Sequence, residues 1–378
     1  MTVLAKEPTT YWDYIRVPEL LELQGGLERN ERGISQEEVV FITIHQVYEL
    51  WLKLLLRDLV VARDLFAQPH VPDDALAGAC RLLGRIRLIL ELASNHFGLM
   101  ETMTPRDYLD FRDKLFPASG GQSAQFREIE ILLGVKGSER PPYVTECSFM
   151  DVLKEPDGSD GWAMDRVKSR LADEPTLKEA IDEWLFRTPI DGSCPGDYSD
   201  HELVDAFVDR YLQAHAVALE ELADHVCGFA ATREEEAQLR QRYDAEIEQA
   251  ARFLRAEDVP DVEDRPRRKR VRAALLFIES YRELPLLAWP REILEGIVAV
   301  EQAYVMFRQR HARMAERIIG RRVGTGGSTG VDYLDEGALR YRIFHDLWAA
   351  RTMLVQRGRL PSPLTAEYYG FRSEAAIG

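Results

Sequence analysis

Residues 311–334 read HARMAERIIGRRVGTGGSTGVDYL, the end of a long helical pattern followed by a glycine-rich turn. The pattern begins at about residue 291, carries His311 near its end, and is expected to stop at Gly320. The turn over residues 324–330 has little to bury, but it offers bare backbone N–H groups and hydroxyls that suit it to holding a ligand. A histidine beside such a turn predicts a ligand or cofactor site on a helical scaffold.

On either side of this stretch, apolar side chains recur three or four residues apart, which is the period of a helix. Capping residues precede several of these segments: Ser35 with Glu38, Thr104 with Asp107, Ser199 with Glu202, and Thr232 with Glu235. No alternating run is convincing, and no repeat of roughly 20–50 residues is present. The sequence therefore predicts an all-α fold of long antiparallel helices. The expected helices cover residues 35–68, 73–97, 104–116, 124–133, 163–173, 176–187, 199–227, 232–256, 268–283, 291–320 and 337–357.

The chain has 378 residues, of which 46% are hydrophobic and 30% charged, as is usual in soluble globular proteins. Its formal net charge of -16 argues against nucleic acid and anionic membrane surfaces as partners. The N-terminal residues show no apolar segment of a secretory signal, and no uncharged apolar run reaches the roughly 20 residues that span a bilayer. These observations predict a cytoplasmic protein without a membrane-spanning segment.

The four cysteines, at positions 80, 147, 194 and 227, lie far apart in the sequence. This spacing excludes a CxxC redox pair, a zinc ribbon and a CxxCH haem attachment site. We expect free thiols in a reducing compartment.

The composition varies along the chain in a way that predicts one domain with three parts. Residues 1–34 form an aromatic arm, residues 35–134 and 265–378 form a helical core, and residues 135–264 form a helical excursion. The basic run RPRRKRVR, residues 265–272, has no interleaved aromatic residues. We interpret it as a helix flank that faces acidic residues rather than as a nucleic-acid surface.

Three groups of residues carry possible chemistry. Phe41 and His45 share one face of an apolar helix, and Tyr108 and Arg112 combine a phenol with a guanidinium that can grip a carboxylate. His311 with its glycine-rich turn is the third group. The alternatives without function are a hydrogen-bonded core histidine for His45 and a surface salt bridge for Arg112.

Taken together, the groups predict an apolar cavity with a cation for a carboxylate and up to two histidines. Two helical histidines in an all-α core could both ligate a haem iron, or one could ligate it while the other acts on the open side. Neither histidine has the ExxH or HExxH pattern of a non-haem metal site. The turn lacks the lysine of a P-loop and follows a helix rather than a strand.

Long blocks of the sequence resemble the tryptophan 2,3-dioxygenase family. FITIHQVYELWLK (residues 41–53), ETMTPRDYLDFRDKLFPASGGQS (residues 101–123) and the stretch 311–334 are similar to its three signature blocks. TYWDYIRVPELLELQ, residues 10–24, resembles the aromatic segment with which the family opens. The resemblance covers about residues 10–357 in the family's order.

This resemblance implies an all-α haem enzyme that contains heme b and acts with ferrous iron. The implied reaction inserts both atoms of O2 across the indole C2–C3 bond of L-tryptophan and gives N-formylkynurenine, as in tryptophan catabolism through the kynurenine pathway. It also implies a cytoplasmic homotetramer, a dimer of dimers.

The resemblance further implies a role for each matching residue. His311 matches the ligand of the haem iron, and His45 matches the catalytic histidine that meets the indole N–H. Arg112 and Tyr108 match the pair beside the substrate carboxylate, and Thr325 matches the threonine beside its ammonium group. The other matches are Phe41 and Leu115 in the indole pocket, Ser119 and Gly120 beside the haem, and Tyr11, Tyr14 and Ile15 in an arm that closes a neighbouring subunit's pocket.

A few positions depart from the family pattern. Gly121 stands where the family usually has phenylalanine, and Asp335 where arginine is usual. Related haem enzymes that oxidise substituted tryptophans, some of them inserting one oxygen atom, are therefore an alternative, as is a non-catalytic haem sensor of O2. A haem tethered through a cysteine four residues after His311 is not expected, because Ala315 holds that position.

Overall fold

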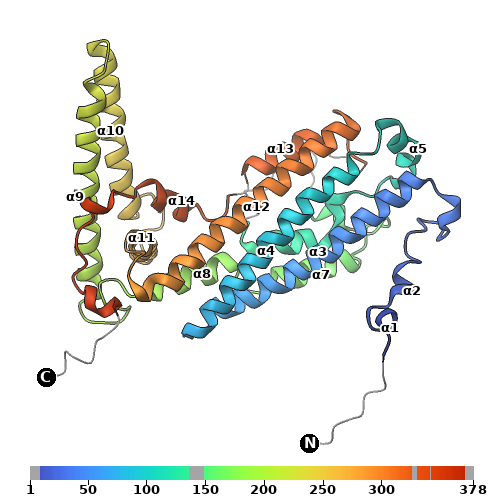
Figure 1. The fold of residues 1–378 in the computed structure, drawn as a ribbon, viewed down its shortest axis with the longest axis horizontal. Coiled ribbons are helices and arrows are strands. Elements are labelled where there is room, and N and C mark those ends of the chain that lie inside the picture. Colours follow the sequence, from blue (N-terminus) through green and yellow to red (C-terminus); the bar gives the residue numbers. More distant parts are fainter. Residues whose placement is uncertain (1–8, 136–148, 326–329, 341, 371–378) are drawn as a thin grey trace, which may run out of the picture.

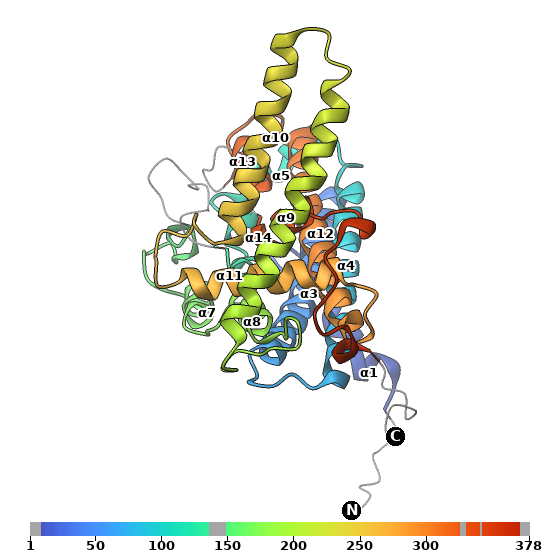
Figure 2. The same ribbon diagram turned by 90° about the vertical axis from the view of Figure 1, so that its left-hand side faces the viewer.

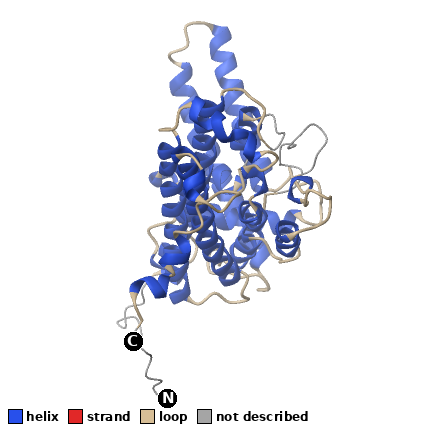
Figure 3. Cartoon of the chain, turned by 90° about the vertical axis from the view of Figure 1, so that its right-hand side faces the viewer, coloured by secondary structure: helices blue, strands red, loops and turns tan. Residues whose placement is uncertain are grey.

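The computed structural model describes residues 9–135, 149–325, 330–340 and 342–370. Within these ranges the regular structure is helical and no β-strand occurs (Figure 3), so the all-α prediction is confirmed. The α-helices are α1 (Tyr11–Ile15), α2 (Val17–Leu20), α3 (Gln36–Phe66), α4 (Asp73–Met100), α5 (Pro105–Leu115), α6 (Ala124–Leu133), α7 (Trp162–Leu171), α8 (Leu177–Arg187), α9 (Asp200–Cys227), α10 (Arg233–Leu254), α11 (Arg265–Ser280), α12 (Ala288–Ile319), α13 (Val331–Arg340) and α14 (His345–Thr352). Short 3₁₀ turns include η2 (Gly120–Gln122).

The centre of the molecule is a layer of three long helices, α3, α4 and α12, which lie side by side in Figure 1. α3 and α4 are antiparallel, as predicted, and Arg85 of α4 forms an ion pair with Asp58 of α3 at 2.5 Å. α12 instead runs parallel to α4. A Cβ built at Gly296 of α12 would lie 3.0 Å from the Leu83 side chain, so the two helices approach closely. This close packing sets the framework on which the candidate site is built.

Helix starts follow the local capping signals in three of the four predicted places. The hydroxyl of Ser35 accepts a hydrogen bond from the Glu38 N–H, Thr232 accepts from the Glu235 N–H, and Thr104 with Asp107 forms a complete capping box. The capping box predicted at Ser199 is wrong. Its side chain makes no cap bond, and its ψ of 5° lies far from the extended backbone of the other caps.

The helix predicted over 337–357 is also wrong, because two helices, α13 and α14, occupy this region. The carboxylate of Glu301, which is buried in α12, accepts hydrogen bonds from the Ile343 N–H at 2.5 Å and the Phe344 N–H at 3.0 Å. It also accepts one from the Trp348 indole. A distant carboxylate thus takes up backbone donors between the two helices, and the local sequence carries no sign of it.

The basic run forms the first half of α11, and its side chains meet acids from other helices. Arg267 contacts Glu183 at 2.7 Å, and Lys269 contacts Asp205. The interpretation as a flank facing acids is therefore confirmed.

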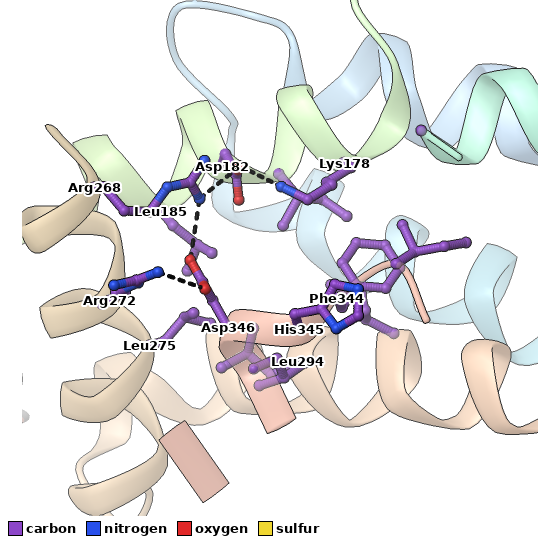
Figure 4. Close-up of a pocket in the computed structure, with 15 residues that line it drawn as sticks. Lys178, Asp182, Leu185, Arg268, Arg272, Leu275, Leu294, Phe344, His345 and Asp346 are labelled. Carbon is purple, nitrogen blue, oxygen red and sulfur yellow. Dashed lines mark hydrogen bonds and ion pairs between the residues drawn. The ribbon is translucent and has the colours of Figure 1, made fainter. Parts of the chain in front are cut away.

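Two further arginines of the run, Arg268 and Arg272, help to line a cavity of about 220 Å³ between α8, α11, α12 and α14 (Figure 4). The charged residues of this cavity pair with one another: Lys178 and Arg268 with Asp182, and Arg268 and Arg272 with Asp346.

The 135–264 excursion contributes two kinds of structure among its described residues. α7 and α8 pack against the core helices α6 and α3, whereas α9 and α10 form an antiparallel hairpin that projects from the body (Figures 1 and 2). The division into arm, core and excursion stays a prediction.

Cys80, Cys194 and Cys227 are free thiols, and residue 147 lies outside the described ranges.

Among the described residues, α3 is long and apolar enough to cross a membrane by length and composition. A single helix of this kind is weak evidence for a membrane span, because core helices of soluble proteins pass the same test. α3 packs on α4, α6 and α8 along its length.

Candidate active site

His45 lies on α3 directly against Phe41, with ring centroids 4.1 Å apart. Its Nδ1 is 2.8 Å from the Phe41 carbonyl oxygen, and since a carbonyl only accepts, Nδ1 must carry the proton. Burial lowers the pKa of His45, although this hydrogen bond and Glu49 act in the opposite direction. The imidazole is therefore neutral near pH 7, with an unprotonated Nε2 that can accept a hydrogen bond.

Tyr108 and Arg112 lie one turn apart on α5, next to the same phenylalanine. The Tyr108 ring is 6.1 Å from that of Phe41, and the side chain is buried. Burial raises the pKa of the Tyr108 phenol, while the nearby Arg112 acts to lower it. Tyr108 is thus a neutral hydroxyl beside a permanent cation, an arrangement suited to a carboxylate.

The glycine-rich turn lies against α5 and the chain that follows it. Arg112 Nη2 donates to the Val323 carbonyl at 2.6 Å, and the Thr325 hydroxyl donates to the Ala118 carbonyl at 2.7 Å. Residues 326–329 of the turn lie outside the described ranges. The structure therefore brings the segment that holds Thr325 against α5 and the residues after it, so the two residues that the resemblance assigns to the charged ends of an amino acid lie on adjoining segments.

The remaining predicted residues of this region, Leu115, Ser119 and Gly120, lie between the end of α5 and the start of η2. Leu115, the last residue of α5, packs partly buried against the core. Ser119 caps η2, where its hydroxyl accepts from the Gly121 N–H at 3.2 Å. A Cβ built at Gly120 would meet no atom within 4 Å, so the turn faces open space.

His311 lies on α12, and its ring stacks on Phe97 of α4 with centroids 5.3 Å apart and planes 7° from parallel. The Tyr48 ring is 5.2 Å from Phe97 and 6.2 Å from His45, so aromatic rings connect the two histidines. Burial lowers the pKa of His311 to about 4, with further contributions from Arg308 and His45. The second imidazole is therefore also neutral near pH 7, as a nitrogen ligand of a metal must be.

A family model for tryptophan 2,3-dioxygenase matches residues 2–354. A tryptophan 2,3-dioxygenase of Sorangium cellulosum is 52% identical over 366 residues, which is 96% of this chain and 88% of that protein. Tryptophan 2,3-dioxygenase 2 of Ralstonia nicotianae is 50% identical over 98% of this chain and its own full length. A tryptophan 2,3-dioxygenase of Bdellovibrio bacteriovorus is 32% identical over 94% of this chain.

The chain belongs to the tryptophan 2,3-dioxygenase family. The resemblance seen in the sequence is thereby confirmed over nearly the whole chain. Family members are haem-dependent oxidoreductases of the dioxygenase class.

The residues around the two histidines fit the haem of this family. The Tyr48 hydroxyl and the Trp51 indole N–H are buried and have no hydrogen-bond partner among the described residues. Both lie on α3 within one aromatic cluster with His45 and His96. These two unpaired donors could bind the polar substituents of a flat macrocycle, while the apolar rings contact its faces and a neutral imidazole offers a nitrogen to its metal.

Sequence reasoning missed the buried aromatic and charged residues that precede His311 on α12, and the residues of other helices that contact this part of α12. Phe307, Arg308 and Tyr304 precede it by four, three and seven positions, and all three are buried. These offsets are the spacing of one helix face, so the period alone could have placed them beside the histidine. Phe97 and Glu130 come from other helices and left no such signal.

Asp335, where the tryptophan 2,3-dioxygenase family usually has arginine, pairs with Arg313 and ties α13 to α12.

Tyr11 and Tyr14 of the arm are 73% and 79% exposed, and Ile15 is exposed too. α1 stands apart from α3, α5 and α12 in Figure 1, so the arm does not cover the candidate site of its own chain.

Proposed function

We propose that this protein is a haem-dependent tryptophan 2,3-dioxygenase that inserts both atoms of O2 across the indole C2–C3 bond of L-tryptophan. The product would be N-formylkynurenine, which begins tryptophan breakdown. One observation carries the proposal: two neutral imidazoles, His45 and His311, are joined by a buried aromatic cluster, and a cation and hydroxyls lie beside one of them.

His311 would hold heme b through its ring nitrogen, with Ser119 and Gly120 beside the macrocycle. When bound, the ferrous haem would supply the activation of O2. The low pKa of His311 keeps its lone pair available for the metal.

The other residues would bind and orient the substrate. His45 Nε2 would accept the indole N–H, since Nδ1–H is already engaged with Phe41. Arg112 would exchange the Val323 carbonyl for the substrate carboxylate, a stronger partner for a guanidinium, with Tyr108 as a second donor. Thr325 would turn its hydroxyl from Ala118 to the ammonium group. Phe41 and Leu115 would form apolar walls that exclude water and fix the ring.

The exposed apolar residues support assembly as a homotetramer, a dimer of dimers. α3 leaves Leu50, Leu54 and Val61 exposed, and α4 leaves Leu88, Leu92 and Leu99 exposed, although both helices are central to the fold. Apolar side chains of this number on a soluble chain favour burial against another copy. The arm residues Tyr11, Tyr14 and Ile15 would then close the pocket of a neighbouring subunit.

We further propose that the enzyme works in the cytoplasm without a membrane or nucleic-acid partner, on L-tryptophan or a substituted tryptophan. The negative net charge and the internal pairing of the basic run support this.

The test is an assay of the reduced, haem-loaded protein with ¹⁸O2 and L-tryptophan, followed by mass spectrometry. We expect N-formylkynurenine that carries both labelled atoms. A product with a single labelled atom would contradict the dioxygenase proposal in favour of a monooxygenase. Haem and O2 binding without any consumption of O2 would favour a sensor.

A further inference from the structure

A buried network of charges joins α6 to α12, η2 and α13, and the proposed reaction does not use it directly. Its centre is Glu130 of α6, which is fully buried. One carboxylate oxygen contacts Arg308 Nη1 of α12 at 2.8 Å, and the other contacts Arg127 Nη1 at 2.9 Å. Arg308 also donates to the Tyr304 hydroxyl at 3.1 Å. One carboxylate therefore holds α6 and α12 together at a point one turn before His311.

Arg127, which is also buried, reaches from Glu130 to two further segments. Its Nε donates to the Gly121 carbonyl of η2 at 3.3 Å, and its Nη2 lies 3.3 Å from the Tyr333 hydroxyl of α13. η2 follows the segment that holds Ala118, and α13 begins directly after the glycine-rich turn. Arg127 thus contacts the chain on both sides of the seam where Thr325 meets Ala118.

The two halves of the network serve opposite sides of the proposed site. Through Arg308, Glu130 is fixed to the helix that carries the proposed iron ligand. Through Arg127, it is fixed to η2, which follows the Ala118 that Thr325 contacts, and to α13. A rigid path of charge-assisted hydrogen bonds therefore runs from the histidine side to the substrate side.

We propose that Glu130 and Arg127 are positioning residues that fix Thr325, against Ala118, relative to His311. The inference rests on the proposed function and adds to it a pair of residues that the proposal does not assign to contact with substrate or haem. A buried ion pair contributes little net stability compared with apolar packing, so its value here lies in the geometry it holds. The hydrogen bond from Arg127 to the Tyr333 hydroxyl fixes the position of α13 relative to α6.

The experiment measures tryptophan binding without turnover, by titrating L-tryptophan into the ferric haem-loaded enzyme and following its absorption spectrum. Tyr333→Phe removes one hydroxyl at the far end of the path. We expect it to weaken tryptophan binding about fivefold while leaving the spectrum before titration unchanged. Glu130→Gln weakens the ion pairs in both directions, and we expect about tenfold weaker binding together with a shifted haem spectrum.

Glu279→Gln is the matched control. Glu279 is a buried carboxylate of α11 whose partner, Arg351, lies on α14, away from the site. We expect this variant to lose thermal stability while it keeps the wild-type spectrum and tryptophan affinity. If it weakens binding as much as Glu130→Gln does, the network acts only through general stability and the positioning role is rejected.

The remaining outcomes also decide the question. Wild-type affinity in both Tyr333→Phe and Glu130→Gln would overturn the proposal, and if Glu130→Gln fails to fold, Tyr333→Phe decides alone. A wild-type protein that takes up haem but binds no tryptophan would contradict the proposed function instead. In that case, amide hydrogen exchange over residues 321–325 replaces the titration: faster exchange in Tyr333→Phe supports the positioning role, and unchanged exchange rejects it.

Discussion

His45 and His311 carry the same side chain, but their surroundings assign them different tasks. His45 has its Nδ1–H committed to the Phe41 carbonyl, whereas His311 stacks on Phe97 and has a pKa lowered to about 4. We expect His311→Ala to abolish the spectrum of a histidine-ligated haem in the reconstituted protein. His45→Ala should keep the haem and lose about tenfold in kcat/KM, the worth of one hydrogen bond to the indole. The opposite pattern in the two absorption spectra would reverse the assignment.

Arg112 is the residue on which substrate affinity should depend most. Its guanidinium already donates to a backbone carbonyl, and its Nε is buried without a partner among the described residues, so it has donors available for a carboxylate. Arg112→Ala should cost about 2–4 kcal/mol of tryptophan binding, because a desolvated carboxylate would go unpaired. The measurement is KM for L-tryptophan. Arg106→Ala, an exposed arginine at the start of the same helix, is the control and should leave KM unchanged.

At the scale of the element, α5 depends on its N-terminal cap. Thr104 accepts from the Asp107 N–H at 3.3 Å, and the Asp107 carboxylate accepts from the Thr104 N–H at 3.0 Å. Thr104→Ala should therefore lower the free energy of unfolding by about 1 kcal/mol, measured by urea denaturation. Thr104→Ser keeps the hydroxyl and should recover most of this loss. Equal losses in the two variants would mean that the cap contributes nothing.

The α9–α10 hairpin contains a histidine that should make stability depend on pH. His215 is buried, and burial lowers its pKa, although Glu246 of α10 acts in the opposite direction. The unfolded chain takes up a proton below about pH 6.5, where the folded protein does not, so His215 should reduce stability as the pH falls through that value. Urea unfolding at pH 7.5 and pH 5.0 measures the effect. His215→Leu should lose less stability between these pH values than the wild type does, and an identical loss would contradict the assignment.

Elements were predictable where their signals are local. The caps at Ser35, Thr104 and Thr232 depend on neighbours three residues away, and the structure confirms them. The break between α13 and α14 was not predictable, because it depends on Glu301, which lies about 40 residues earlier in the sequence. The same holds for the site: the face of α12 around His311 follows from the helical period, but its contact with Glu130 of α6 follows from tertiary packing alone.

At the scale of the whole molecule, the aromatic arm does not cover the candidate site of its own chain. Ring contacts join the candidate site residues of α3 and α5 to each other and, through Tyr48 and Phe97, to His311 of α12, but the arm does not cover them. Tyr11 and Tyr14 stay exposed, while Gln24 ties the end of the arm to Gln46 of α3 at 2.6 Å. An arm that is anchored at its base and exposed at its aromatic tip is suited to reach another subunit. We therefore expect the native mass to be that of four 43.3 kDa chains, measured by light scattering.

Complementation between subunits tests this arrangement directly. One variant, Tyr11→Ala with Tyr14→Ala, lacks the arm's aromatic rings but keeps an intact pocket, and Arg112→Ala keeps the arm but has a defective pocket. Each homotetramer should bind tryptophan weakly, for different reasons. When the two chains are co-expressed, mixed tetramers contain intact pockets closed by intact arms, so activity should exceed that of either variant alone at the same haem content. If the arm closed the pocket of its own chain, no subunit would combine the two intact parts, and co-expression would restore nothing.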